Sequence, residues 1–456
     1  MRTLSFAAAA LCSLVAAQIS QATPFERPDG AGAYEELRAG YAALFTCSAH
    51  FIMGRPLADI KQVELVDLGP ALPHIEIDPV RQLVRARDGD VATAHTAIAA
   101  YRDSLGCTVL PPNWTEADVP RLPYVAMAAN PDVSKVDFPQ GDKVRVRSTG
   151  PQRALLQRAF DGTSFGEGTV TLATLVIKDG KLVAEQYRDG FGIHTGYRTW
   201  STAKSVAATL IGIALRDGLI ELDNSIDLPE WQYYNDPRQA ITWRHLLNMS
   251  SSLNSAGAST GALYFGGQDV VSSITRSALA GEPNTIWKYA NADTLLLLYA
   301  LRHKLNDDLR YLRYPYDELF HKIGMFHSRY EVDHLGNFIG SSQMYTTARD
   351  LARFGLLYLQ QGVWNGEQIL PEGWTDLVAK RAPAMPAEAT QGYGGQFWLI
   401  GDYEGVPDDA YTTAGNKGQL VTIIPSENMV VVRTGVDPNG KRWQQHEFVK
   451  AVLAAF

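Results

Sequence analysis

Apolar residues form short β-rich runs near the two ends of one long region, and they follow a helical period between those ends. Residues 171–190, TLATLVIKDGKLVAEQYRDG, form two β-rich runs around Asp179-Gly180, a dipeptide that accepts the positive φ angles of a tight hairpin turn. A second hairpin pattern covers residues 419–436, QLVTIIPSENMVVVRTGV, and turns at residues 425–428. Residues 443–456 have the apolar spacing of a closing amphipathic helix.

Helical spacing dominates between the two hairpins, in ITWRHLLNMSSSL, NADTLLLLYALRHKL and TTARDLARFGLLYLQQG. Strands at both ends of a region with helices between them predict one sheet that the two ends complete together. The intervening helices predict a second lobe, and their apolar stripes are typical of core-facing helices rather than of lipid contacts.

Residues 23–150 are predicted to form a separate, small α+β module. Residues 34–47 have helical spacing, residues 74–90 alternate around a turn, and residues 94–107 return to a second cysteine. Stretches rich in Pro and Asp follow, so we place the boundary near residue 150, before a catalytic region of residues 151–456.

The first 22 residues resemble a secretion signal. One Arg precedes an apolar stretch over residues 4–17, and the small residues that come next are suited to cleavage by a signal peptidase after Ala17 or Ala22. A short buried helix is the alternative, but this pattern at the extreme N-terminus favours export, to the periplasm or the medium.

The charge pattern argues against nucleic acid or an anionic membrane as a partner. The net charge is −8, and no long run of Lys and Arg occurs in the 456 residues. No segment after the signal has the ~20 uninterrupted apolar residues that span a bilayer. A small-molecule or short oligomeric substrate is therefore expected. The sequence does not indicate the oligomeric state of the protein.

Three cysteines occur, and Cys12 lies inside the signal. In an oxidising compartment the remaining pair, Cys47 and Cys107, predicts one disulfide, with two separate buried thiols as the alternative. The ten histidines form no H-x-x-x-H pattern and the cysteines no C-x-x-C pattern, so no metal site is predicted.

Candidate chemistry begins at WSTAKS, where Ser201 stands three residues before Lys204 at the start of an apolar helical run. This spacing brings the amine one turn from the hydroxyl, and a helix N-terminus favours negative charge on the serine oxygen. An ordinary helix cap with a solvated lysine is the alternative. A lysine base must be neutral near pH 7, which requires burial or suitable neighbours.

Tyr289 and Asn291, in WKYANAD before another apolar helix, provide a proton relay and an amide for Lys204 or a substrate carbonyl. Two similar patterns are rejected. YYN at residues 233–235 lies in a polar loop with no helix after it. GTSFG around Ser164 has a helix before and a strand after the serine, the reverse of the order that a G-x-S-x-G nucleophile needs.

These stretches, in this order, resemble the serine β-lactamase and penicillin-binding superfamily, in its class C-like branch. The resemblance covers roughly residues 155–456 and rests on WSTAKS, DGLIELDNSI, ITWRHLLNMSSSL, YAN and GSSQMYTTARDLARFGLLYLQQGVWNGEQILPEGW. The last block resembles the carboxylesterases and 6-aminohexanoate-oligomer hydrolases in particular. The resemblance implies an antiparallel sheet flanked by helices, an all-helical lobe, and an active site between them.

The superfamily's third motif, K-T-G or H-x-G, departs from its usual form. Asn416-Lys417-Gly418 occupies its place, with Lys417 one position late, where strand alternation would point it to the opposite face. Lys417 as a solvated hairpin residue is the alternative. Gly418 is expected to allow close backbone approach, and by analogy the N–H groups of Gln419 and Ser201 form the oxyanion hole.

The resemblance implies an acyl-enzyme on Ser201, with Lys204 and Tyr289 moving protons and with no metal or organic cofactor. We therefore expect an exported serine hydrolase that cleaves an ester or a linear amide. One alternative is a β-lactamase or D-amino-acid peptidase (DD-peptidase), and another is a ligand sensor that turns over slowly or not at all. Tyr264, Tyr393 and Trp398 are expected either to line an apolar cleft or to serve as packing.

Overall fold

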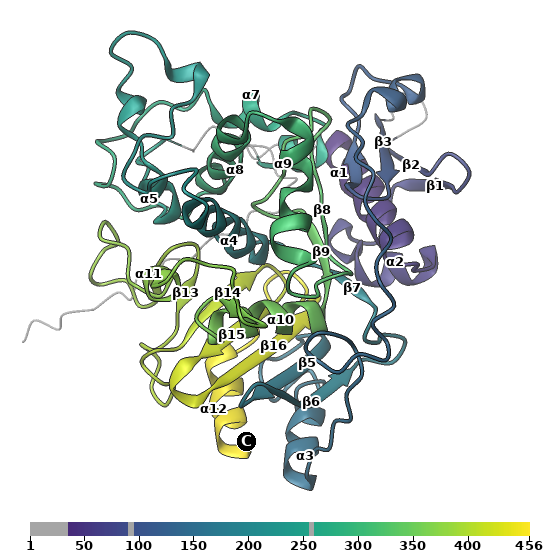
Figure 1. Ribbon diagram of the computed structural model, residues 1–456. Coiled ribbons are helices and arrows are strands. Elements are labelled where there is room, and N and C mark those ends of the chain that lie inside the picture. Colours follow the sequence, from purple (N-terminus) through teal and green to yellow (C-terminus); the bar gives the residue numbers. More distant parts are fainter. Residues whose placement is uncertain (1–34, 90–94, 255–259) are drawn as a thin grey trace, which may run out of the picture.

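The computed structural model describes residues 35–89, 95–254 and 260–456 (Figure 1). The predicted signal at residues 1–22 lies outside the described residues. Within these ranges, no helix is both long enough and apolar enough to cross a bilayer.

The N-terminal part is a helix packed on a four-stranded antiparallel sheet. Helix α1 (Glu35–Cys47) contacts the central strands of the sheet, whose order is β1-β2-β3-β4. The strands are β1 (His74–Asp78), β2 (Leu83–Asp88), β3 (His95–Arg102) and β4 (Gly106–Val109). Helix α2 (Leu57–Val63) and a short 3-10 helix (Val66–Leu68) connect α1 to this sheet.

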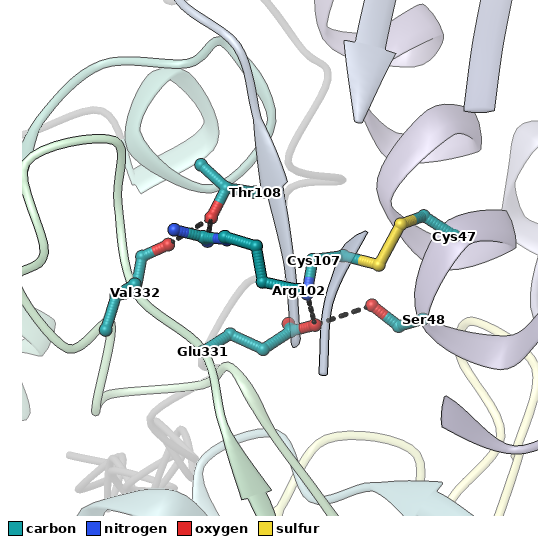
Figure 2. Close-up of a disulfide and its surroundings, with 7 residues drawn as sticks. All are labelled: Cys47, Ser48, Arg102, Cys107, Thr108, Glu331 and Val332. Carbon is teal, nitrogen blue, oxygen red and sulfur yellow. Dashed lines mark hydrogen bonds between the residues drawn. A yellow bond between two sulfur atoms is a disulfide. The ribbon is translucent and has the colours of Figure 1, made fainter. Parts of the chain in front are cut away.

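The predicted disulfide is present and joins the end of α1 to β4 (Figure 2). Cys47 and Cys107 have Cα atoms 6.1 Å apart, and both are fully buried. Beside the bridge, the Glu331 carboxylate accepts hydrogen bonds from Ser48 Oγ (2.7 Å) and from the Cys107 backbone N–H (3.0 Å). The disulfide therefore lies where the N-terminal sheet meets the remainder of the chain, and both belong to one continuous apolar core.

A seven-stranded antiparallel sheet forms the centre of the C-terminal part, in the order β12-β13-β14-β15-β16-β5-β6. Both predicted hairpins are present, and the turn residue Asp179 has the positive φ of 51° that its turn requires. Strand β16 pairs with β5, so the two ends of this region complete one sheet as predicted. The strands are β5 (Thr171–Lys178), β6 (Lys181–Tyr187), β12 (Gly392–Tyr393), β13 (Trp398–Leu399), β14 (Tyr411–Gly415), β15 (Gln419–Ile424) and β16 (Met429–Gly435).

Helices cover both faces of this sheet, which explains why its central strands are apolar at nearly every position. Leu175 and Ile177 belong to the core that includes α10 (Ala348–Leu359), whereas Val176 between them belongs to the core of the opposite face. Helices α3 (Gly150–Arg158) and α12 (Gln445–Ala455) pack together on that opposite face (Figure 1). The predicted antiparallel sheet flanked by helices is thus confirmed.

The predicted helical lobe lies between β7 and β8 in the chain. Helix α4 (Thr202–Arg216) packs against α8 and also reaches β14 and β15. The other helices are α5 (Trp243–Leu247), α6 (Thr260–Phe265), α7 (Val270–Ile274), α8 (Asn291–Leu305) and α9 (Asp308–Pro315).

A small antiparallel sheet of order β7-β9-β8 was not predicted, because its strands are only two to four residues long and carry no readable alternation. They are β7 (Gly196–Arg198), β8 (Arg329–Tyr330) and β9 (Met344–Thr347). Other short elements include β10 (Val363–Trp364), β11 (Glu367–Gln368) and α11 (Trp374–Val378).

Candidate active site

Ser201 lies at the junction between β7 and α4. Trp200, just before it, has a φ of +49°, in the left-handed region that a tryptophan rarely adopts. The backbone N–H of Thr199 is tied to Met344 O at 2.9 Å, which fixes this junction to β9. The Ser201 side chain makes no capping hydrogen bond to α4, so the alternative of an ordinary helix cap is wrong.

Lys204 points back to Ser201 from the first turn of α4. Its Nζ lies 3.2 Å from Ser201 Oγ, 2.6 Å from Asn291 Oδ1 and 2.7 Å from the backbone oxygen of Ser341. The side chain is 1% exposed, and burial lowers the pKa of Lys204 to about 7. A substantial fraction of the amine is therefore neutral near pH 7, as a general base requires.

Tyr289 and Asn291 reach the same place from the start of α8. The Tyr289 ring centroid is 5.1 Å from Lys204 Nζ. Burial raises the pKa of Tyr289 to about 12, and its hydrogen bond with Ser201 opposes part of this rise. The tyrosine therefore holds its proton at neutral pH and can donate it.

Aromatic side chains surround Tyr289 on one side. The ring centroids of Tyr393 and Trp398 lie 5.7 Å and 5.3 Å from that of Tyr289. Tyr264 has a different position, because its hydroxyl is 2.5 Å from the Ser341 hydroxyl. Tyr393 and Trp398 thus pack against Tyr289. Tyr264 instead supports Ser341, whose backbone carbonyl contacts Lys204 Nζ.

The third-motif residues form the turn between β14 and β15 rather than part of a strand. Thr202, in the first turn of α4, donates from Oγ1 to Gln419 O at 3.0 Å, which places the start of β15 beside Ser201. Gly415 allows this approach, since a Cβ at that position would lie 2.1 Å from Thr199 O. Asn416 accepts a hydrogen bond from the Lys417 backbone N–H through its own side chain.

Lys417 has neither of the environments that its sequence position suggested. It lies in the turn with a φ of +61°, its side chain is 4% exposed, and its Nζ is 2.5 Å from Asp67 Oδ2 of the N-terminal part. The alternative of a solvated lysine is therefore wrong. Gly418 leaves room for the Arg433 side chain, because a Cβ at position 418 would lie 1.6 Å from Arg433 Nη1.

Some residues of the site were missed by the sequence reasoning. Ser341 acts through a backbone carbonyl, which has no residue-type signal, although it lies in the GSSQMYTT block. Asp293, two residues after Asn291 on α8, accepts a hydrogen bond from Ser251 Oγ at 2.7 Å. Burial raises the pKa of Asp293 to about 7. Asp67 could not be linked to Lys417 without the fold.

The two rejected patterns lie outside the site. Ser164 donates to Asp161 Oδ2 in a turn after α3 and before β5, and Tyr233 and Tyr234 are exposed in a loop. In the part of the chain that the structure describes, one group of His and acidic side chains has the proximity for a metal ion: Asp142, His194 and His327. None of its members belongs to the constellation around Ser201.

Known proteins resemble this chain over its C-terminal two thirds. The beta-lactamase family model matches residues 156–446. A 6-aminohexanoate-dimer hydrolase of Paenarthrobacter ureafaciens is 26% identical over 316 residues, which are 64% of this chain and 79% of that protein.

Solved structures share the fold. A Bacillus anthracis protein provisionally named 6-aminohexanoate-dimer hydrolase aligns with a TM-score of 0.53 and 23% identity, over 62% of this chain and 78% of that one. A penicillin-binding protein homologue from Caulobacter crescentus aligns with a TM-score of 0.52 and 15% identity, over 69% and 99%.

Proposed function

This chain belongs to the beta-lactamase family, and on that premise we propose that it is a serine hydrolase that cleaves linear amide or ester bonds through an acyl-enzyme on Ser201. The observation that carries the proposal is the position of Lys204 Nζ, buried and 3.2 Å from Ser201 Oγ with two further acceptors around it. A helix cap and a solvated lysine would need none of these contacts.

In the proposed reaction, Ser201 Oγ attacks the substrate's carbonyl carbon while its proton moves to Lys204 Nζ. The bond to the leaving group then breaks, and the leaving nitrogen or oxygen takes a proton through Tyr289. The acyl group remains on Ser201 as an ester. Water then adds to that ester, which releases a carboxylic acid and restores the serine hydroxyl.

We assign oxyanion stabilisation to the backbone N–H groups of Ser201 and Gln419. The hydrogen bond from Thr202 to Gln419 O supports this assignment, because it keeps the start of β15 at the first turn of α4. The N-terminus of α4 adds its partial positive charge to the same place.

The substrate that we infer is an unstrained amide or ester rather than a β-lactam. The cation of the third-motif turn is paired with Asp67 and cannot serve a substrate carboxylate without breaking a buried ion pair. The aromatic side chains of Tyr289, Tyr393 and Trp398 favour an apolar acyl chain. The relative from P. ureafaciens is named a 6-aminohexanoate-dimer hydrolase, and this name supports the choice of an amide substrate.

We further propose that residues 23–150 form a module that supports the catalytic region, with export directed by residues 1–22. A disulfide between Cys47 and Cys107 fits an oxidising compartment. The contacts of Ser48 and Cys107 with Glu331 support a structural role for the module.

Turnover of a panel of activated esters, linear 6-aminohexanoate amides, D-amino-acid peptides and penicillins tests the proposal, with intact-mass detection of adducts. We expect hydrolysis of esters and linear amides, with loss of activity in Ser201→Ala and retention in the matched control Ser164→Ala. Full activity in Ser201→Ala would refute the mechanism. Stable penicillin adducts without ester or amide turnover would favour the sensor or peptidase alternatives.

A further inference from the structure

Asp142, His194 and His327 bring a carboxylate and two imidazoles together outside the site around Ser201. One donor atom from each residue lies within 4.8 Å of the donors of the other two. His194 Nδ1 is 4.0 Å from Asp142 Oδ2, and the two imidazole centroids are 4.8 Å apart. Two imidazoles and a carboxylate are a donor set that Zn²⁺ takes in proteins.

The surrounding residues hold two of the three donors in place. Asp142 is 8% exposed, and its Oδ1 accepts from Arg353 Nη2 at 2.8 Å, while its Oδ2 is the oxygen near His194. Arg353 also donates to Asp350, whose other oxygen accepts the His327 backbone N–H at 3.0 Å. A single arginine thus positions both the carboxylate and the backbone of one imidazole, as partners of metal ligands commonly do.

The charges near this group also allow a cation. Two guanidiniums, Arg349 and Arg353, lie beside Asp142, but three carboxylates face them. Arg349 Nη2 pairs with Glu185 at 2.6 Å, and Arg353 Nη1 pairs with Asp350 at 2.8 Å. With Asp142 included, the cluster has one negative charge in excess, which a divalent ion would offset.

We propose that this group binds Zn²⁺ through His194, His327 and Asp142 Oδ2, with water as the fourth ligand. His194 is 58% exposed, so solvent can reach the open position. The three ligands come from the segment around residues 137–143, the turn before β7 and the turn before β8. Because β7 ends three residues before Ser201, the ion would stabilise the chain segment that leads to the nucleophile.

This proposal departs from the sequence-based expectation of no metal. The three ligands stand far apart in the chain, so no short spacing reveals them. Only the packing of β7, β8 and β9 brings two of the three segments together.

Titration of the chelator-stripped full chain with Co²⁺, followed by Zn²⁺ competition, tests the site. We expect one Co²⁺ per chain with visible d–d absorption, displaced by Zn²⁺, and affinity reduced at least tenfold in both His194→Ala and His327→Ala. The matched control His74→Ala removes an exposed histidine of β1 and should bind like the wild type. Zn²⁺ should raise the melting temperature of the wild type but not of the two site variants.

The absence of stoichiometric Co²⁺ absorption in the wild type would overturn the proposal, whether or not the variants fold. Equal binding by the wild type and both folded variants would also overturn it. Neither outcome bears on the role of Ser201, which the turnover assay tests separately.

Discussion

The ammonium nitrogen of Lys417 lies 2.5 Å from a carboxylate oxygen of Asp67, and both side chains are less than 10% exposed. Lys417 belongs to the turn between β14 and β15, whereas Asp67 belongs to the 3-10 helix at Val66–Leu68. This ion pair therefore connects the N-terminal part to the third-motif turn beside Ser201. Buried ion pairs are costly to break from one side, because the remaining charge stays in the interior.

Asp67→Asn should destabilise the protein strongly and displace the turn. Loss of the carboxylate leaves the Lys417 ammonium buried without a counter-charge, which costs about 3–5 kcal/mol. Urea unfolding, followed by circular dichroism, measures the change in the free energy of unfolding.

The double variant Asp67→Asn with Lys417→Met is the control, since it removes both charges together. It should recover most of the stability that the single variant loses. If the free energy of unfolding of Asp67→Asn lies within about 0.5 kcal/mol of the wild-type value, the ion pair does not hold the third-motif turn to the N-terminal part.

The rate of acylation should rise as the pH increases through about 7. Burial lowers the pKa of Lys204 to about 7, so its amine is protonated below that pH and able to accept the Ser201 proton above it. Measuring kcat/KM for an activated ester between pH 5.5 and 9.5 locates the inflection.

Asp293 complicates this measurement, because burial raises its pKa to about 7 as well. The inflection should persist in Asp293→Asn if it reports Lys204. A profile without a rise between pH 6 and 8 in the wild type would contradict a neutral lysine base.

Gly415→Ala should reduce activity by at least tenfold. A Cβ at this position would lie 2.1 Å from the backbone oxygen of Thr199, so the segment leading to Ser201 must move, and a small displacement in an active site can cost about 100-fold. Gly192→Ala is the matched control, since a Cβ at Gly192 meets no atom within 4 Å. Equal kcat/KM for the two variants would count against the inferred contact between β14 and this segment.

Replacing both Cys47 and Cys107 with Ala should lower the free energy of unfolding by about 4 kcal/mol in the chain-entropy model, because the bridge closes a loop with a sequence separation of 60. Thermal and urea unfolding with and without a reductant measure the effect. The reductant should destabilise the wild type and leave the double variant unchanged. Equal stability of the two proteins under oxidising conditions would refute this expectation.

The sequence alone predicted β5, β6, β15 and β16 of the seven-stranded sheet, because these four strands are six to eight residues long and their hairpins carry their own turn residues. Strands β12 and β13 were not predicted, because each has only two residues. Asp179-Gly180 marks one turn, and the pairing of β16 with β5 follows from strands at both ends of the region. The short strands β7, β8 and β9 escaped prediction, since their pairing depends on contacts made far along the chain.

The proximity of Ser201, Lys204, Tyr289 and Asn291 was also predictable, because local spacing and motif order both indicated it. The environment of Lys417 was not, because a residue in a turn can face solvent or a partner, and Asp67 stands 350 positions earlier in the chain. The carbonyl of Ser341 was hidden for another reason, since every residue type has one.

Labelling with a fluorophosphonate probe, followed by peptide mapping of the adduct, tests the central claim about Ser201 most directly. We expect a single adduct on Ser201 at neutral pH, formed at least 100-fold more slowly in Lys204→Ala because the serine loses its base. An adduct elsewhere, for example on Ser164, or labelling that persists unchanged in Ser201→Ala, would contradict the account.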